Sequence, residues 1–174
     1  MQHYEQAVKR LNQGGFYVQW IPLYQVTDAE FAVIAKTMKQ VFPIVTAWRG
    51  DFYAEKPIMA LIGHDSIGQL NEQEMFVQSS MKILQNYETA GQVPLLSHYV
   101  GQIHLDLPFI VDAGINTDDK QIIEYMAPVS HRAEKSGKAK WFIGSELLKV
   151  MHQMRNPNDA YLRGRSEAQM RGLF

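Results

Sequence analysis

The sequence predicts an α/β fold in which a mostly parallel sheet ends in an antiparallel strand. An apolar and aromatic run at residues 16–23 is followed at once by the start signal of a helix, which is typical of alternating strands and helices. Two short apolar segments, 44–48 and 57–63, come next and are close enough to pair with each other. An antiparallel last strand is common in such sheets. The hydrophobic content of 46% in 174 residues is enough for one core.

The first elements are a helix and a buried strand. The helix is predicted because apolar residues recur at helical spacing before Gly14 and Gly15 end it. Those apolar residues are Tyr4, Ala7, Val8 and Leu11. The strand at 16–23 follows, and Pro22 marks its end because proline has no N–H to donate to a sheet.

A second helix at 28–42 has the clearest local signals. Thr27 and Glu30 have the spacing of a capping box, in which each side chain bonds to the other residue's backbone N–H. Pro43 ends the helix. One apolar face follows the helical period: Phe31, Ile34, Ala35, Met38 and Phe42.

The rest of the chain is less regular. We expect an amphipathic helix at 71–87, and we leave 91–115 unassigned because its prolines and glycines give a mixed pattern. The stretch GINTDDKQIIEYMAP reads as a loop followed by a short strand or turn. Ser145 is expected to cap a last helix that reaches about Met154, before a polar tail that begins at Asn156.

Composition excludes several classes of function. The net charge of −1 predicts no overall attraction to nucleic acid, and the absence of cysteine excludes disulfides and thiolate chemistry. No apolar stretch is long enough to span a membrane, and residues 1–10 lack the apolar core of a secretion signal, so we expect a cytoplasmic protein. Residues 131–174 carry nine Lys/Arg and four Asp/Glu, a net +5 that leaves −6 elsewhere. This basic segment is a solvated tail or contacts a partner, RNA or an anionic membrane; the solvated tail is favoured.

Three segments, in order, resemble the spermidine synthase-like (aminopropyltransferase) family. They are GGFYVQWIPLYQVTDAEF, FPIVTAWRGDFYAEKPIMALIG and NTDDKQIIEYMAP. The resemblance implies that residues 1–130 are the C-terminal half of a Rossmann-like class I methyltransferase fold. Residues 131–174 then form a basic helical extension that lies outside the family pattern.

The resemblance also shows what the sequence lacks. Family members hold decarboxylated S-adenosylmethionine with a glycine-rich turn after the first strand and an acidic residue after the second, and their catalytic aspartate follows the fourth strand. No G-x-G-x-x-G-like pattern follows a strand here, because Gly14 and Gly15 precede theirs. We therefore assign no cofactor-binding and no catalytic residue, and expect the missing half to lie on another polypeptide, to be lost, or to come from a partner copy.

The resemblance implies three residues that bind the amine substrate. Gln19 matches a glutamine of the amine pocket, although a shift of one residue would put Trp20 there. Tyr53 matches a tyrosine that lines the amine site, and the neighbouring Asp51 would attract an ammonium group. The alternatives are a strand-end polar residue bonded to the backbone for Gln19, and a solvated hairpin loop for Asp51 and Tyr53.

The acidic residues of the third segment allow a metal reading, since carboxylates are ligands for hard cations. They are Asp118, Asp119 and Glu124. Their spacing does not match an EF-hand, and Asn-Thr-Asp-Asp is ordinary turn chemistry, so we predict a structural turn and no metal.

The expected function is therefore transfer of an aminopropyl group from decarboxylated S-adenosylmethionine to a small diamine, once the missing half is present. The alternative is a non-catalytic half-domain that forms a homo-oligomer or binds a partner, because half a sheet leaves an open strand edge and an uncovered face.

Overall fold

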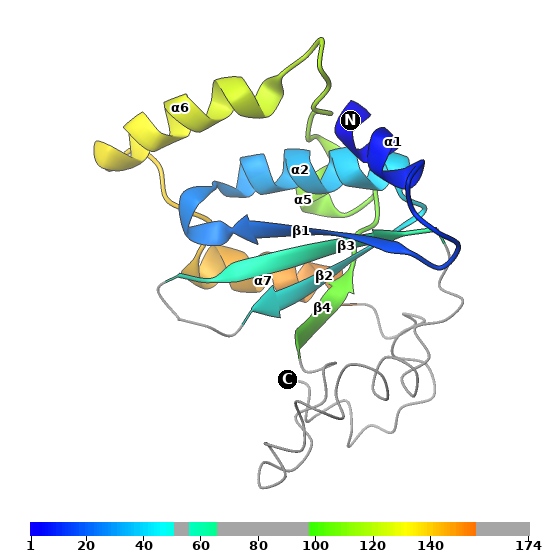
Figure 1. The fold of residues 1–174 in the computed structure, drawn as a ribbon. Coiled ribbons are helices and arrows are strands. Elements are labelled where there is room, and N and C mark those ends of the chain that lie inside the picture. Colours follow the sequence, from blue (N-terminus) through cyan, green and yellow to red (C-terminus); the bar gives the residue numbers. More distant parts are fainter. Residues whose placement is uncertain (51–55, 66–97, 156–174) are drawn as a thin grey trace, which may run out of the picture.

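The computed structural model describes residues 1–50, 56–65 and 98–155, which form a mixed α/β fold around one sheet (Figure 1). In chain order the elements are α1 (Gln2–Val8), β1 (Phe16–Pro22), η1 (Leu23–Gln25), α2 (Asp28–Val41), β2 (Ile44–Gly50), β3 (Ile58–His64), β4 (Tyr99–Gln102), α5 (Pro108–Val111), α6 (Ile122–Lys135) and α7 (Gly144–Met154).

The prediction of a mostly parallel sheet is wrong. The strand order is β1-β3-β2-β4, and all three pairs of neighbouring strands are antiparallel. β1 and β2 do point the same way and are joined through α2, but β3 returns from β2 and lies between them. The two strands that run parallel are therefore never hydrogen-bonded neighbours. β4 then pairs with the free side of β2, from a region that the sequence leaves unassigned.

The central part of the chain was predicted correctly. The expected strand at 16–23 and helix at 28–42 are β1 and α2, and the expected pairing of 44–48 with 57–63 is the β2–β3 pair. The capping box of α2 is also confirmed. The Thr27 N–H donates to the Glu30 carboxylate at 2.6 Å, and the Glu30 N–H donates to Thr27 Oγ1 at 3.3 Å.

The predicted loop ends at Gln121, and the residues after it form a helix, α6, not the short strand or turn that the sequence predicted. α6 contains Pro128 and has no side-chain cap at Gln121, so its local signals are weak. Its first turn is supported from outside the helix, because Asn116 Oδ1 accepts the Ile123 N–H at 3.0 Å. In Figure 1, α6 lies beyond α2, on the side away from the strands.

The ends of the other helices differ from prediction by a few residues. α1 ends at Val8, before Leu11. α7 ends at Met154 as predicted, but its N-cap is Ile143 and Ser145 lies inside the helix. The helix predicted at 71–87 and the tail from Asn156 lie outside the described residues.

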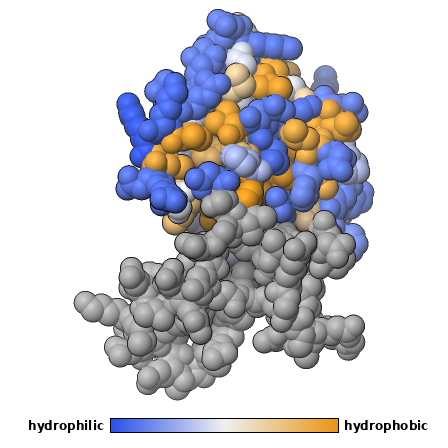
Figure 2. Space-filling model, turned by 90° about the vertical axis from the view of Figure 1, so that its right-hand side faces the viewer, coloured by the Kyte–Doolittle hydropathy of each residue, from blue (hydrophilic) through white to orange (hydrophobic). Residues whose placement is uncertain are grey.

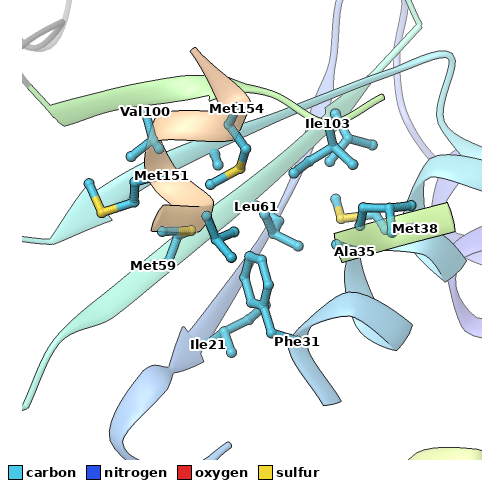
Figure 3. Packing of buried hydrophobic residues seen from close by; sticks show 14 of the residues in the cluster. Ile21, Phe31, Ala35, Met38, Met59, Leu61, Val100, Ile103, Met151 and Met154 are labelled. Atoms are coloured by element: carbon cyan, nitrogen blue, oxygen red, sulfur yellow. The ribbon is translucent and has the colours of Figure 1, made fainter. Parts of the chain in front are cut away.

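The main core lies on one face of the sheet and is covered by α1, α2, α5 and α7. Figure 3 shows part of it, where Phe31 of α2 and Met154 of α7 point toward Leu61 of β3. Because side chains alternate along a strand, Ile21, Met59 and Leu61 all face this core. α2 contributes Phe31, whose ring lies 5.1 Å from that of Phe142. Phe142 precedes α7, so residues on both sides of position 130 share one core.

The opposite face carries a smaller apolar cluster and none of the described helices contributes to it. Its buried members are Trp48, Ala60 and Tyr99, with Val18 and Ile62 packed against them. Within the described ranges, no helix has both the length and the apolar character that crossing a membrane requires.

Candidate functional site

Gln19 lies in the middle of β1, on the face of the sheet that carries the main core. It is the fourth of seven residues, three positions before Pro22, which is about 10 Å along a strand. Asp51 and Tyr53 lie outside the described residues. The described part of the chain therefore does not bring the three predicted amine-binding residues together, and their shared role stays a prediction.

The surroundings of Gln19 form a compact aromatic group, here called the Tyr4 cluster: His3, Tyr4, Tyr17, Gln19 and Phe42. The Tyr4 hydroxyl donates a short hydrogen bond to Gln19 Oε1. His3 Nε2 and the Tyr17 hydroxyl are 2.8 Å apart. The rings of Tyr17 and Phe42 are stacked with centroids 5.8 Å apart and 18° between their planes, and the Tyr4 ring meets Tyr17 edge-on.

Two features of the sequence place this cluster. α1 carries Tyr4 on the side that faces the sheet, and residues two apart on β1 share a face, so Tyr17 and Gln19 point toward the helix. Trp20 points to the opposite face and is 57% exposed. Trp20 and Gln19 therefore belong to different surroundings, and only Gln19 is part of the cluster.

Burial controls the electrostatics of the cluster. It raises the pKa of Tyr4 well above the usual range of a tyrosine, and the neighbouring Tyr17 raises it further. Burial also raises the pKa of Tyr17. Both hydroxyls are therefore protonated at neutral pH, so neither can act there as a general base.

The cluster offers neutral hydrogen-bond acceptors and aromatic rings. An amide oxygen has two lone pairs, so Gln19 Oε1 keeps one acceptor site beside the bond from Tyr4. The ring of Tyr17, which is less buried than that of Tyr4, would add a weak attraction for an ammonium group. None of the five members of the cluster is a carboxylate.

The third segment of the resemblance begins with a turn that bonds to two helices, α2 and α1. The Asn116 N–H donates to Thr37 Oγ1 of α2 at 2.9 Å, and the Asp118 N–H donates to Gln2 Oε1 of α1 at 3.1 Å. Asp118 and Asp119 are exposed. Among the residues that the structure describes, no three His, Asp or Glu side chains converge in a way that could hold a metal ion.

Sequence reasoning missed Tyr4, His3 and Tyr17 as neighbours of Gln19. The alternation of β1 gave a signal for Tyr17, because it is two residues from Gln19 and shares its face. The contact with Tyr4 is made between α1 and the sheet, and no local pattern reports where a helix packs.

The chain does not fit the cofactor-binding role of the family. Gly14 has the positive φ of a turn, +72°, but this turn leads into β1 and does not follow a strand. The segment directly after β1 is η1, which contains no glycine. Neither the turn at Gly14 nor η1 therefore matches the glycine-rich turn of the family.

The chain matches no family model, no curated protein and no solved structure.

Proposed function

We propose that this chain is the C-terminal part of a spermidine synthase-like aminopropyltransferase and is inactive without the half that binds decarboxylated S-adenosylmethionine. That half would lie on another polypeptide, on a longer form of this chain, or in a partner copy. It would supply the glycine-rich turn, the acidic residue and the catalytic aspartate that residues 1–174 lack.

The observation that carries the proposal is how the three resembling segments pack. The first contains β1 and the start of α2, and the second contains β2 and β3. β3 pairs with both β1 and β2 over seven residues, so these two segments form one continuous sheet. The third segment bonds to α1 and α2 through Asp118 and Asn116. Segments that resemble one family domain therefore pack as one unit.

In the described structure, we assign the binding of the diamine to Gln19. Its amide oxygen would accept a hydrogen bond from the diamine, and the Tyr17 ring would face the ammonium group. Tyr4 positions the Gln19 side chain by donating to the same oxygen. The diamine must be deprotonated before it attacks, so the base belongs to the missing half.

The test starts from the native protein in its source cells. An antibody against residues 131–174 recovers the chain with whatever is joined to it, and intact mass spectrometry compares it with 19.9 kDa. The recovered material is then incubated with labelled decarboxylated S-adenosylmethionine and a panel of linear diamines. We expect labelled aminopropyl product, together with a heavier chain or a second polypeptide that contains a glycine-rich turn.

A matched pair of variants tests the role of Gln19. Gln19→Leu keeps the size of the side chain and removes its acceptor, so we expect a higher KM for the diamine. Gln102→Leu makes the same change on β4, outside the Tyr4 cluster, and should leave that KM unchanged. If the recovered protein has the mass of the chain alone, has no partner and transfers no aminopropyl group, the proposal is wrong.

The second candidate function is a non-catalytic half-domain that binds a partner through its sheet. It is favoured by a specific observation: β1 is a terminal strand of the sheet, and its exposed side chains include aromatic ones. On the side of the molecule at which β1 begins, hydrophobic residues are exposed between hydrophilic ones (Figure 2).

A further inference from the structure

The free edge of β1 presents backbone groups that have no partner in the described structure. The Leu23 N–H donates to the Pro57 carbonyl at 3.0 Å, which continues the register of the β1–β3 pair. In an antiparallel pair the hydrogen-bonded residues alternate, so residues 17, 19 and 21 bond to β3. The N–H and C=O groups of Phe16, Val18 and Trp20 then point away from the sheet. Within the described ranges, no backbone group bonds to them.

This edge lacks the features that normally prevent strands from pairing between molecules. β1 is seven residues long and contains no charged residue, and its proline stands at the last position. The opposite edge differs, because β4 has only four residues and an irregular register against β2. α7 also packs against β4, so closely that a Cβ on Gly101 would lie 2.6 Å from the carbonyl carbon of Met154. The edge at β4 is therefore short and irregular, whereas the edge at β1 is long and regular.

Two side chains at the open edge are more than half exposed. Phe16 is 53% exposed and Trp20 is 57% exposed, and both lie on the face that carries none of the described helices. Val18 lies between them on that face and packs against the smaller cluster. Two large aromatic side chains beside a row of unsatisfied backbone groups fit a second strand with aromatic residues of its own.

We propose that the open edge of β1 pairs with β1 of a second copy of this chain, in antiparallel orientation, about a two-fold axis at Val18. The sheet would then run continuously through both copies. The order Phe-x-Val-x-Trp makes the edge complementary to itself, which is the condition for a closed two-fold dimer.

The register follows from which groups point outward. With Val18 opposite the second copy's Val18, Phe16 of each copy lies opposite Trp20 of the other. The three outward-facing residues thereby form three opposed pairs, each of which exchanges two hydrogen bonds. Both exposed aromatic residues gain an aromatic cross-strand neighbour on the same face. Pro22, which has no N–H to donate, stays outside this set of pairs.

This dimer does not depend on the proposed transferase function. A strand from a missing half would need the same outward-facing groups of β1, so one copy cannot pair with both partners at once. The dimer is tested with residues 1–174 alone, whereas transfer activity needs the missing half. The failure of either proposal is therefore visible without the other.

Sedimentation equilibrium of the purified 174-residue chain gives the first result. We expect a monomer–dimer equilibrium with a limiting mass twice that of the chain, and slow exchange of the amide hydrogens of Phe16, Val18 and Trp20 in the dimer. Val18→Pro removes an N–H that no strand of the monomer uses, whereas Val18→Thr keeps it. We expect the proline variant to weaken dimerisation at least 10-fold and the threonine variant to dimerise as the wild type does.

A charge swap tests the register and does not rely on proline. Phe16→Lys with Trp20→Lys puts like charges opposite each other in both pairs and should give a monomer. Phe16→Lys with Trp20→Glu puts opposite charges there and should restore the dimer, in a salt-dependent way. Circular dichroism confirms that each variant is folded. A wild-type chain that stays monomeric, or a dimer that both charge variants leave equally strong, overturns the proposal.

Discussion

The packing of α7 against β4 can be tested at Gly101. A Cβ at this position would overlap the carbonyl oxygen of Met154 and lie 2.6 Å from its carbonyl carbon. Carbon atoms pack best at about 3.5–4 Å, so Gly101→Ala must move the end of α7 away from the sheet by about 1 Å. The obstacle is backbone, which cannot rotate aside as a side chain can. The move would loosen three core residues of α7: Val150, Met151 and Met154.

The expected cost follows from this geometry. Overpacking a core costs about 1–3 kcal/mol, and contact with backbone places Gly101→Ala at the upper end, about 3 kcal/mol. For a chain of this size each kcal/mol lowers Tm by about 2–4 °C, so the expected drop is about 6–12 °C. Calorimetry or thermal circular dichroism measures it.

Gly137→Ala is the matched control. Gly137 has φ +70° and no atom within 4 Å of the position of a Cβ, so the same substitution meets only backbone strain. That strain costs about 1 kcal/mol, or about 2–4 °C in Tm. If Gly101→Ala is no more destabilising than Gly137→Ala, then the end of α7 does not lie against Gly101 of β4.

Two further predictions concern the helix cap and the Tyr4 cluster. Thr27→Ala removes the acceptor for the Glu30 N–H and should lower the free energy of unfolding by about 1 kcal/mol, as measured by urea titration. Thr27→Ser keeps a hydroxyl acceptor and should keep the stability of the wild type. Equal losses in the two variants would contradict the role of the cap. Because the pKa of Tyr4 is raised in the folded state, folding favours its protonated hydroxyl. The Tyr4 hydroxyl therefore adds fully to the free energy of unfolding below about pH 10, and this addition is lost as the pH rises further. Tyr4→Phe should therefore flatten the fall of stability above about pH 10, measured by urea titrations at a series of pH values; a fall as steep as that of the wild type would contradict this.

The sequence alone determined the elements whose signals are local. α2 is the clearest case, because Thr27 and Glu30 form its cap from within four residues and Pro43 lies directly after its C-cap. The limits of β1 likewise follow from the glycines before it and Pro22 at its end. Such signals act between residues that are neighbours in the chain, so no tertiary contact is needed to read them.

α6 shows where local signals are insufficient. Pro128 lies inside it and its N-cap residue, Gln121, makes no side-chain cap, both of which argue against a helix in the sequence. The structure supplies what the sequence lacks, since Asn116 caps the first turn from outside the helix and α2 packs against it. β4 is similar, because four residues that include a glycine form a strand only where β2 offers an edge.

For the candidate site, too, part was predicted from the sequence and part was decided by the tertiary structure. The sequence selected Gln19 through a resemblance and placed it on a strand, but the structure decided that it lies under α1 and bonds to Tyr4. The alternation of strand and helix suggested a mostly parallel sheet, whereas the insertion of β3 between β1 and β2 made every pair antiparallel. Strand order and helix docking depend on contacts between residues far apart in the chain. A local pattern of residues indicates that one face of a helix or strand is apolar. Only the tertiary structure decides which other element packs against that face.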